Sequence, residues 1–150
     1  MAPPEPEREA SRGRGHRLAP HTADCILEAW GEDRTSCLAE AMTALVEVFA
    51  EVHGDDAATR TLPLAAEPGP DADVLVALLE EVIYVADVFG AVPVRFHVVE
   101  AEDGGIAGDM VVVTGRQVEL VGPVPKGVSY HDLEVGEHEG RWTCRAVVDV

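Results

Sequence analysis

The sequence is poor in several residue types that mark particular classes of protein. It holds three Phe, two Trp and two Tyr among 150 residues, so we expect a core built mainly of Val, Leu and Ala. No apolar run approaches the roughly 18–20 residues that a membrane span needs. The N-terminus also has no apolar stretch of the kind found in secretory signals. We therefore expect a cytoplasmic protein that does not enter a membrane.

Cysteines and catalytic motifs are equally scarce. Cys25, Cys37 and Cys144 are odd in number and form no CxxC pair, which argues against a disulfide framework and against a structural zinc site. We expect three reduced thiols that pack as small hydrophobic groups. There is no Gly-rich phosphate loop, no GxSxG motif and no HExxH motif. The sequence therefore predicts a protein that is not itself an enzyme.

Basic residues are few. Eleven Lys and Arg stand against 28 Asp and Glu, which gives a net charge of −17. A chain this negative repels phosphate backbones, and no stripe of basic residues with interleaved aromatics is present, so we expect no direct, tight nucleic-acid binding. The same charge would speed the encounter with a basic partner, such as a basic nucleic-acid enzyme.

The composition changes near residue 15. Residues 1–15 are mostly Pro, Glu, Arg and Gly and predict a disordered N-terminal tail. The remainder, 16–150, has the length and apolar content of a single domain.

Two helices are predicted from apolar residues recurring at intervals of three and four. The first is capped by Thr35 or Ser36 and ends near Gly54. The second is capped by Asp71 or Asp73 and ends at Gly90.

The other predicted elements are strands, over 25–30, 60–64, 92–101, 106–115, 117–121, 127–135 and 141–150. Pro63 weakens the second of these as a central strand. The turn at 102–105 suits a hairpin. This order favours an α+β fold, in which two helices pack on a mostly antiparallel β-sheet.

Two aspartates lie at the ends of predicted strands. His21-Thr22-Ala23-Asp24 directly precedes the first predicted strand. One interpretation is a turn held by side-chain hydrogen bonds. The other is that Asp24 presents a carboxylate suited to Ca²⁺ or Mg²⁺.

Asp149 lies one residue from the C-terminus. Alternation puts it on one face with Val147, while Ala146, Val148 and Val150 lie on the other. Its carboxylate is either solvated at a frayed strand end or paired, since an unpaired charge on an apolar strand is costly. Strand pairing could bring two carboxylates together as a divalent-metal site, with the terminal carboxylate of Val150 nearby.

Lys126 is the only lysine in the chain and follows the loop GPVP. A lysine kept where the protein otherwise uses arginine indicates a position that the planar guanidinium does not suit. The neighbouring Tyr130 and His131 are more typical of strand packing and surface polarity than of ligands, although a ligand role for His131 stays open.

These segments together resemble the archease family. The resemblance rests on HTAD before a strand (21–24), on KGVSYHDLEV (126–135), on Trp142 and on a closing VDV (148–150). The helical segment 73–90 is also similar to the second helix of that family. The resemblance to the family covers essentially the whole chain except the N-terminal tail.

The resemblance implies an accessory protein of the RtcB-type, GTP-dependent RNA ligase, used in tRNA splicing and RNA repair. Such proteins promote guanylylation and multiple turnover of the ligase and bind a divalent metal, Ca²⁺ or Mg²⁺/Mn²⁺. Carried over, Asp24 and Asp149 would be the metal ligands, with Val150 contributing through its backbone, and Lys126 would be the functional lysine. His21 and Thr22 would shape the turn before the first aspartate.

Two alternatives use the same residues differently. A stand-alone metal-dependent phosphoesterase would need a general base and a substrate pocket, and the sequence indicates neither. A chaperone-like binding module would need no metal.

Overall fold

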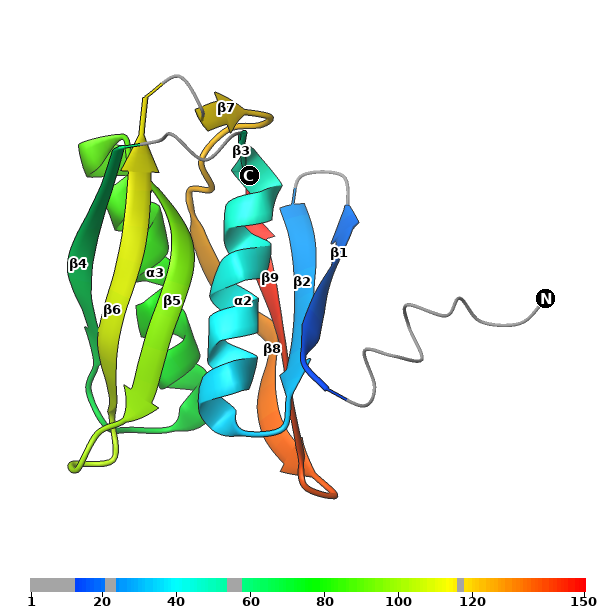
Figure 1. The fold of residues 1–150 in the computed structure, drawn as a ribbon. Helices are drawn as coiled ribbons and strands as arrows, with labels where there is room; N and C mark the ends of the chain where they lie inside the picture. Colours follow the sequence, from blue (N-terminus) through cyan, green and yellow to red (C-terminus); the bar gives the residue numbers. More distant parts are fainter. Residues whose placement is uncertain (1–12, 21–23, 54–57, 116–117) are drawn as a thin grey trace.

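A computed structural model describes residues 13–20, 24–53, 58–115 and 118–150. This part of the chain forms two helices and nine strands, in agreement with the predicted α+β class (Figure 1). In chain order the elements are β1 (Gly15–Pro20), β2 (Asp24–Gly31), α2 (Arg34–Phe49), β3 (Ala50–Val52), β4 (Ala58–Ala66), α3 (Asp71–Phe89), β5 (Val92–Glu100), β6 (Ile106–Thr114), β7 (Val118–Leu120), β8 (Gly127–His138) and β9 (Arg141–Asp149).

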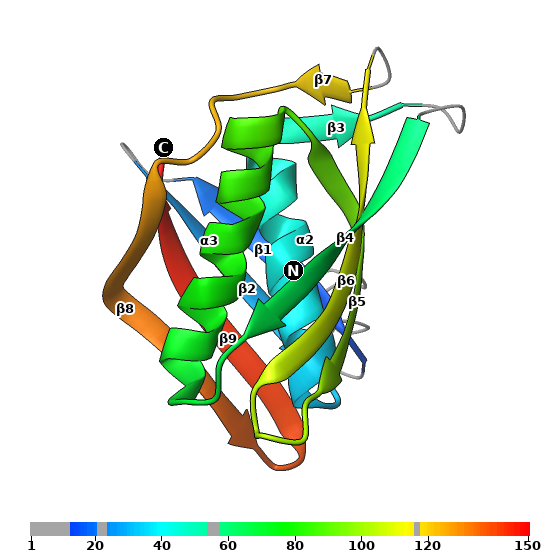
Figure 2. The ribbon, with the colours of Figure 1, turned by 90° about the vertical axis from the view of Figure 1, so that its left-hand side faces the viewer.

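The strands form three antiparallel sheets. One has four strands in the order β1-β2-β9-β8, one has three in the order β4-β6-β5, and β3 pairs with β7 in a short ribbon. The helices lie between the two larger sheets: α2 contacts β1, β2 and β9 on one side and β5 on the other (Figures 1 and 2). The antiparallel pairing was predicted, whereas the division into separate sheets was not.

The core lies in this helical layer and on the sheet faces that cover it. Side chains alternate between buried and more exposed along β2, whose Cys25, Leu27 and Ala29 are buried. The same alternation buries Cys144, Ala146 and Val148 of β9. Most buried side chains are Val, Leu and Ala, as the composition predicts.

The three thiols belong to this core. Each is free and buried, which confirms the prediction that they pack as hydrophobic groups. Burial raises the pKa of Cys25, and a hydrogen bond with Cys37 together with burial raises the pKa of Cys144. These shifts keep Cys25 and Cys144 in their unreactive, protonated form.

The helix ends correct three details of the sequence-based prediction. The N-cap of α2 is Asp33, whose Oδ1 accepts a hydrogen bond from the backbone N–H of Ser36 at 2.8 Å. The helix ends at Phe49, because the chain turns directly into β3. The N-cap of α3 is Pro70, with no side-chain cap. Gly90 ends α3 with a φ of 62°, as predicted. Neither of these two helices is long and apolar enough to cross a membrane.

Two strands differ most from the prediction. β1 was not predicted, although it begins at the position where the sequence changes composition. β4 runs farther in both directions than the predicted 60–64 and lies at the edge of its sheet, where Pro63 is tolerated. The predicted tail falls largely on residues 1–12, outside the described part of the chain.

Candidate functional site

Asp24 and Asp149 lie directly opposite each other on neighbouring strands. Asp24 begins β2 and Asp149 ends β9, and the antiparallel register pairs the two residues. Residues paired in this way have Cβ atoms about 4.5–5.5 Å apart. The structure therefore brings together the two carboxylates that the sequence separates by more than a hundred residues.

Both carboxylates belong to the outer face of the four-stranded sheet. The next cross-strand pair, Cys25 and Val148, is buried against the helices. Because successive side chains alternate between faces, Asp24 and Asp149 extend from the opposite face. Val147 lies on that same outer face, which confirms the predicted alternation. The site is open to solvent, with Asp149 exposed and Asp24 half-buried.

Lys126 is held beside this pair by the backbone. Its N–H donates a hydrogen bond to the carbonyl oxygen of Asp149 at 2.7 Å. The next residue, Gly127, is the cross-strand partner of Asp149 on β8. Lys126 is exposed. The only lysine of the chain thus has its backbone at the same sheet end as the two aspartates.

The other predicted site residues divide into three groups. Val150 follows Asp149 and packs, partly buried, against the core. His21 and Thr22 lie outside the described residues. His131 is not part of the carboxylate group: it lies on a bulge of β8 and pairs with Asp132 at 3.3 Å.

The bulge has a backbone cause. Between Ser129 and Glu134, β8 advances five residues while β9 advances two, and Asp132 has a φ of 58°. Tyr130, which lies within the bulge, donates a hydrogen bond from its Oη to Oδ1 of Asp73 at 3.2 Å. The bulge therefore contacts the first turn of α3. His131 therefore stands on an exposed projection of the strand and not over the sheet end.

The outer face carries a second group that the sequence analysis missed. Arg17 forms an ion pair with Glu28 at 3.2 Å, and the guanidinium of Arg141 stacks over the ring of Trp30 at 5.8 Å. With Thr143, these side chains line a hollow of about 290 Å³. Five residues from β1, β2 and β9 make up this group, so only strand pairing could reveal it. Unlike the aspartate pair, it combines both signs of charge.

The chemistry of the aspartate pair suits a hard divalent cation. Carboxylate and carbonyl oxygens are the ligands that Ca²⁺ and Mg²⁺ prefer. Asp24 and Asp149 supply carboxylates from two strands, and the backbone at Val150 is adjacent. This donor set fits such an ion. The fold and the pair together define a small, acidic α+β protein whose helices lie between antiparallel sheets and whose carboxylates meet where two strand ends pair.

Comparison with known proteins identifies the family to which this chain is similar. The model of the archease protein family (MTH1598/TM1083) matches residues 16–150. A probable protein archease of Mycobacterium tuberculosis (strain CDC 1551 / Oshkosh) is 38% identical over 137 residues, which cover 91% of this chain and 75% of that protein. A protein archease of Methanopyrus kandleri is 27% identical over 139 residues, covering 87% and 95%.

Solved structures show the same fold. The solution structure of Protein 1598 of Methanobacterium thermoautotrophicum superposes with a TM-score of 0.67 at 20% identity, covering 91% of this chain and 99% of that one. The crystal structure of a Thermotoga maritima archease, described as a possible chaperone, gives 0.64 at 20% identity, covering 89% and 96%. The chain belongs to the archease family.

Proposed function

We propose that this archease is an accessory protein of an RtcB-type, GTP-dependent RNA ligase, and that it promotes guanylylation and multiple turnover of the ligase in tRNA splicing and RNA repair. The observation that supports this most is the pairing of Asp24 with Asp149 beside Lys126. These are the three residues to which the family resemblance assigns a function.

In this proposal Asp24 and Asp149 hold a divalent metal ion, Ca²⁺ or Mg²⁺/Mn²⁺, with the backbone at Val150 as a further oxygen donor. When bound, the ion supplies positive charge that helps to align phosphate groups. The two strands fix the carboxylates relative to each other, because the β2–β9 register sets their separation. Lys126 balances the negative charge of the pair or contacts a phosphate or carboxylate of the ligase.

The acidic surface provides the docking force. The net charge of −17 attracts a basic ligase surface over long range. The carboxylate pair lies on an exposed sheet face at a strand end, where a partner can reach it. The archease contributes no nucleophile of its own in this scheme and acts on the chemistry of its partner.

The test compares charge-matched variants. Asp24→Asn and Asp149→Asn should each lower the stimulation of ligase guanylylation by about tenfold or more. Asp87→Asn, which removes the same charge from an exposed position on α3, should leave stimulation unchanged. Circular dichroism and thermal unfolding of each variant check that the fold is intact. Full stimulation by folded Asp24→Asn and Asp149→Asn proteins would overturn the metal-based proposal.

Two controls separate the alternatives. If a chelator leaves the ligase interaction and its stimulation unchanged, the protein is a binding module of the chaperone-like kind suggested for the Thermotoga maritima relative. If the purified chain alone hydrolyses a panel of phosphoesters with Mg²⁺ or Mn²⁺, and Asp24→Asn abolishes this activity, it is a phosphoesterase.

A further inference from the structure

A second group of metal-binding side chains lies on the ribbon formed by β3 and β7. The ribbon pairs three residues with three: Ala50 with Leu120, Glu51 with Glu119, and Val52 with Val118. It is anchored to the body of the protein because β3 continues directly from α2. The two glutamates are therefore fixed opposite each other by the backbone register.

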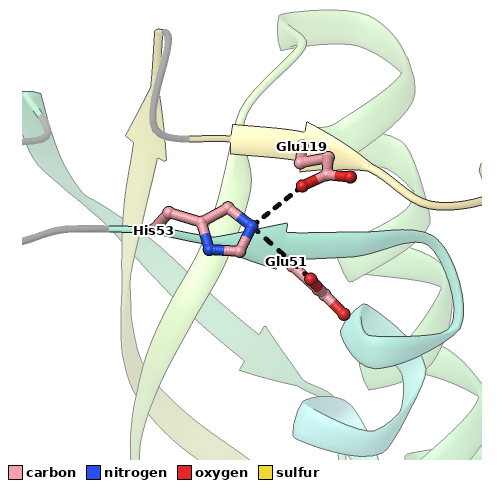
Figure 3. A group of neighbouring side chains, drawn as sticks. All are labelled: Glu51, His53 and Glu119. Atoms are coloured by element: carbon pink, nitrogen blue, oxygen red, sulfur yellow. Dashed lines mark hydrogen bonds and ion pairs between the residues drawn. The ribbon is translucent and has the colours of Figure 1, made fainter.

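Like charges directly opposite on paired strands destabilise the pairing. Here an imidazole lies between them. His53 Nε2 is 2.9 Å from Oε1 of Glu119 and 3.4 Å from Oε2 of Glu51 (Figure 3). His53 follows β3 two residues after Glu51, and so extends from the same face of the extended chain. The three ligand atoms lie within 4.8 Å of one another.

This donor set differs in kind from the aspartate pair. An imidazole nitrogen is a ligand of Zn²⁺ and neighbouring transition metals, which also accept carboxylate oxygens, whereas Ca²⁺ and Mg²⁺ prefer oxygen alone. The side chains are 58%, 60% and 62% exposed for Glu51, His53 and Glu119, so an ion can reach them from solvent. Three protein ligands also leave coordination positions open for water or another ligand.

The surroundings favour occupancy by a cation. The cluster borders an open groove of about 690 Å³ that Glu51 and His53 line together with apolar side chains of β1, α2, β3 and β5. Glu47 lines the same groove and adds negative charge. The net charge of the chain raises the local concentration of cations further.

We propose that Glu51, His53 and Glu119 bind a divalent transition-metal ion of the zinc class, at a site separate from Asp24 and Asp149. The ion takes the place of the proton on His53 Nε2, and this proton leaves to solvent or moves to Nδ1. The two carboxylates then coordinate the ion, and its positive charge offsets the repulsion between them. Binding ties β3 to β7 and leaves open coordination positions beside the groove.

The two sites lie at the same end of the molecule but on different sheets, as both ribbon views show (Figures 1 and 2). The test therefore uses the full chain with Asp24→Asn and Asp149→Asn already introduced, so that the aspartate pair does not contribute to the binding that is measured. Zn²⁺ is titrated by calorimetry, and the ring signals of His53 are followed by NMR.

In this background we expect saturable binding of one Zn²⁺, a shift of the His53 ring signals and a rise in the unfolding temperature. Glu51→Gln, His53→Gln and Glu119→Gln should each weaken binding about tenfold or more. His97→Gln, at an exposed histidine of β5, should not.

The outcomes are distinct. Equal Zn²⁺ affinity in the His53→Gln and His97→Gln proteins, or titration without any change in the His53 signals, would overturn the proposal. The proposed ligase function is tested separately, because it depends on Asp24 and Asp149. Loss of stimulation in the aspartate variants with Zn²⁺ binding retained is the result that both proposals predict.

Discussion

At the scale of single residues, His16 of β1 is held by two carboxylates of α2. Its Nδ1 lies 2.8 Å from Oε1 of Glu40, and its Nε2 lies 2.8 Å from Oε1 of Glu47. Both nitrogens can donate only when the ring is protonated. The hydrogen bond to Glu40 raises the pKa of His16 above 6.5, against the opposing effect of burial, and Glu47 raises it further.

This pKa shift predicts a pH-dependent stability. Because the folded pKa is higher than the unfolded one, the contribution of His16 is complete below the unfolded value and is lost as pH rises through the folded value. His16→Gln should lower the free energy of unfolding by about 1 kcal/mol near pH 6, and by much less near pH 9. Urea unfolding of both proteins at each pH measures the difference. An equal loss at both pH values, or an equal effect of His97→Gln, would contradict the assignment.

Single residues also show what the sequence could predict about the site. The period of two in a strand was enough to place Asp149 with Val147 on one face. It could not fix the register of β2 on β9, since a slip of two residues preserves the alternation but would separate Asp24 from Asp149. His131 resembled a strand residue because nothing in its neighbourhood marks a bulge: Asp132 takes a positive φ without being glycine.

At the scale of elements, Arg34 joins three parts of the fold. Its side chain, 13% exposed, donates to Oδ1 of Asp71 at 2.7 Å, to both carboxylate oxygens of Glu100 at 2.9 and 3.0 Å, and to the carbonyl oxygen of Gly104 at 3.0 Å. The start of α2 is thereby tied to the start of α3 and to the β5–β6 hairpin. The planar fork of the guanidinium allows all of these bonds at once.

Lysine cannot reproduce this geometry. We expect Arg34→Lys to lower the free energy of unfolding by about 1–2 kcal/mol, because charge is kept but several hydrogen bonds are lost. Arg95→Lys, at an exposed arginine of β5, should change it by less than about 0.5 kcal/mol. Denaturant unfolding at neutral pH measures both variants. Equal stability of the two would show that the network contributes nothing beyond its charge.

The elements that the sequence analysis predicted are those with a sustained periodic pattern. α2, α3 and the β5–β6 hairpin were found because apolar spacing and turn residues agree over many positions. β3 was not predicted, because three residues are too few to show a period and the first helix was expected to continue through them. β7 falls within the predicted strand 117–121, but its pairing with β3 was not predicted, because the two strands lie far apart in the chain. The Glu51–His53–Glu119 cluster depends on that pairing and so was invisible in the sequence.

At the scale of the whole molecule, the distribution of charge matters more than its sum. The net charge is −17, yet Arg17, Arg141 and Arg145 gather with Lys126 on or beside the outer face of the four-stranded sheet. Glu28 lies among them: it forms an ion pair with Arg17 and is the cross-strand partner of Arg145. The acidic field therefore surrounds a sheet face of mixed sign, on which the aspartate pair lies at one end.

This arrangement predicts how the association with a basic ligase responds to salt. Long-range attraction acts on the encounter, so raising ionic strength from about 0.05 to about 0.5 M should lower the association rate constant about tenfold or more. The dissociation rate constant, which depends on short-range contacts, should change much less. Stopped-flow measurements with labelled protein separate the two, and a salt with an organic cation distinguishes screening from competition at a metal site. An association rate that does not respond to salt would mean that the acidic surface serves solubility and does not guide docking, because no attraction between net charges in water escapes screening at that ionic strength.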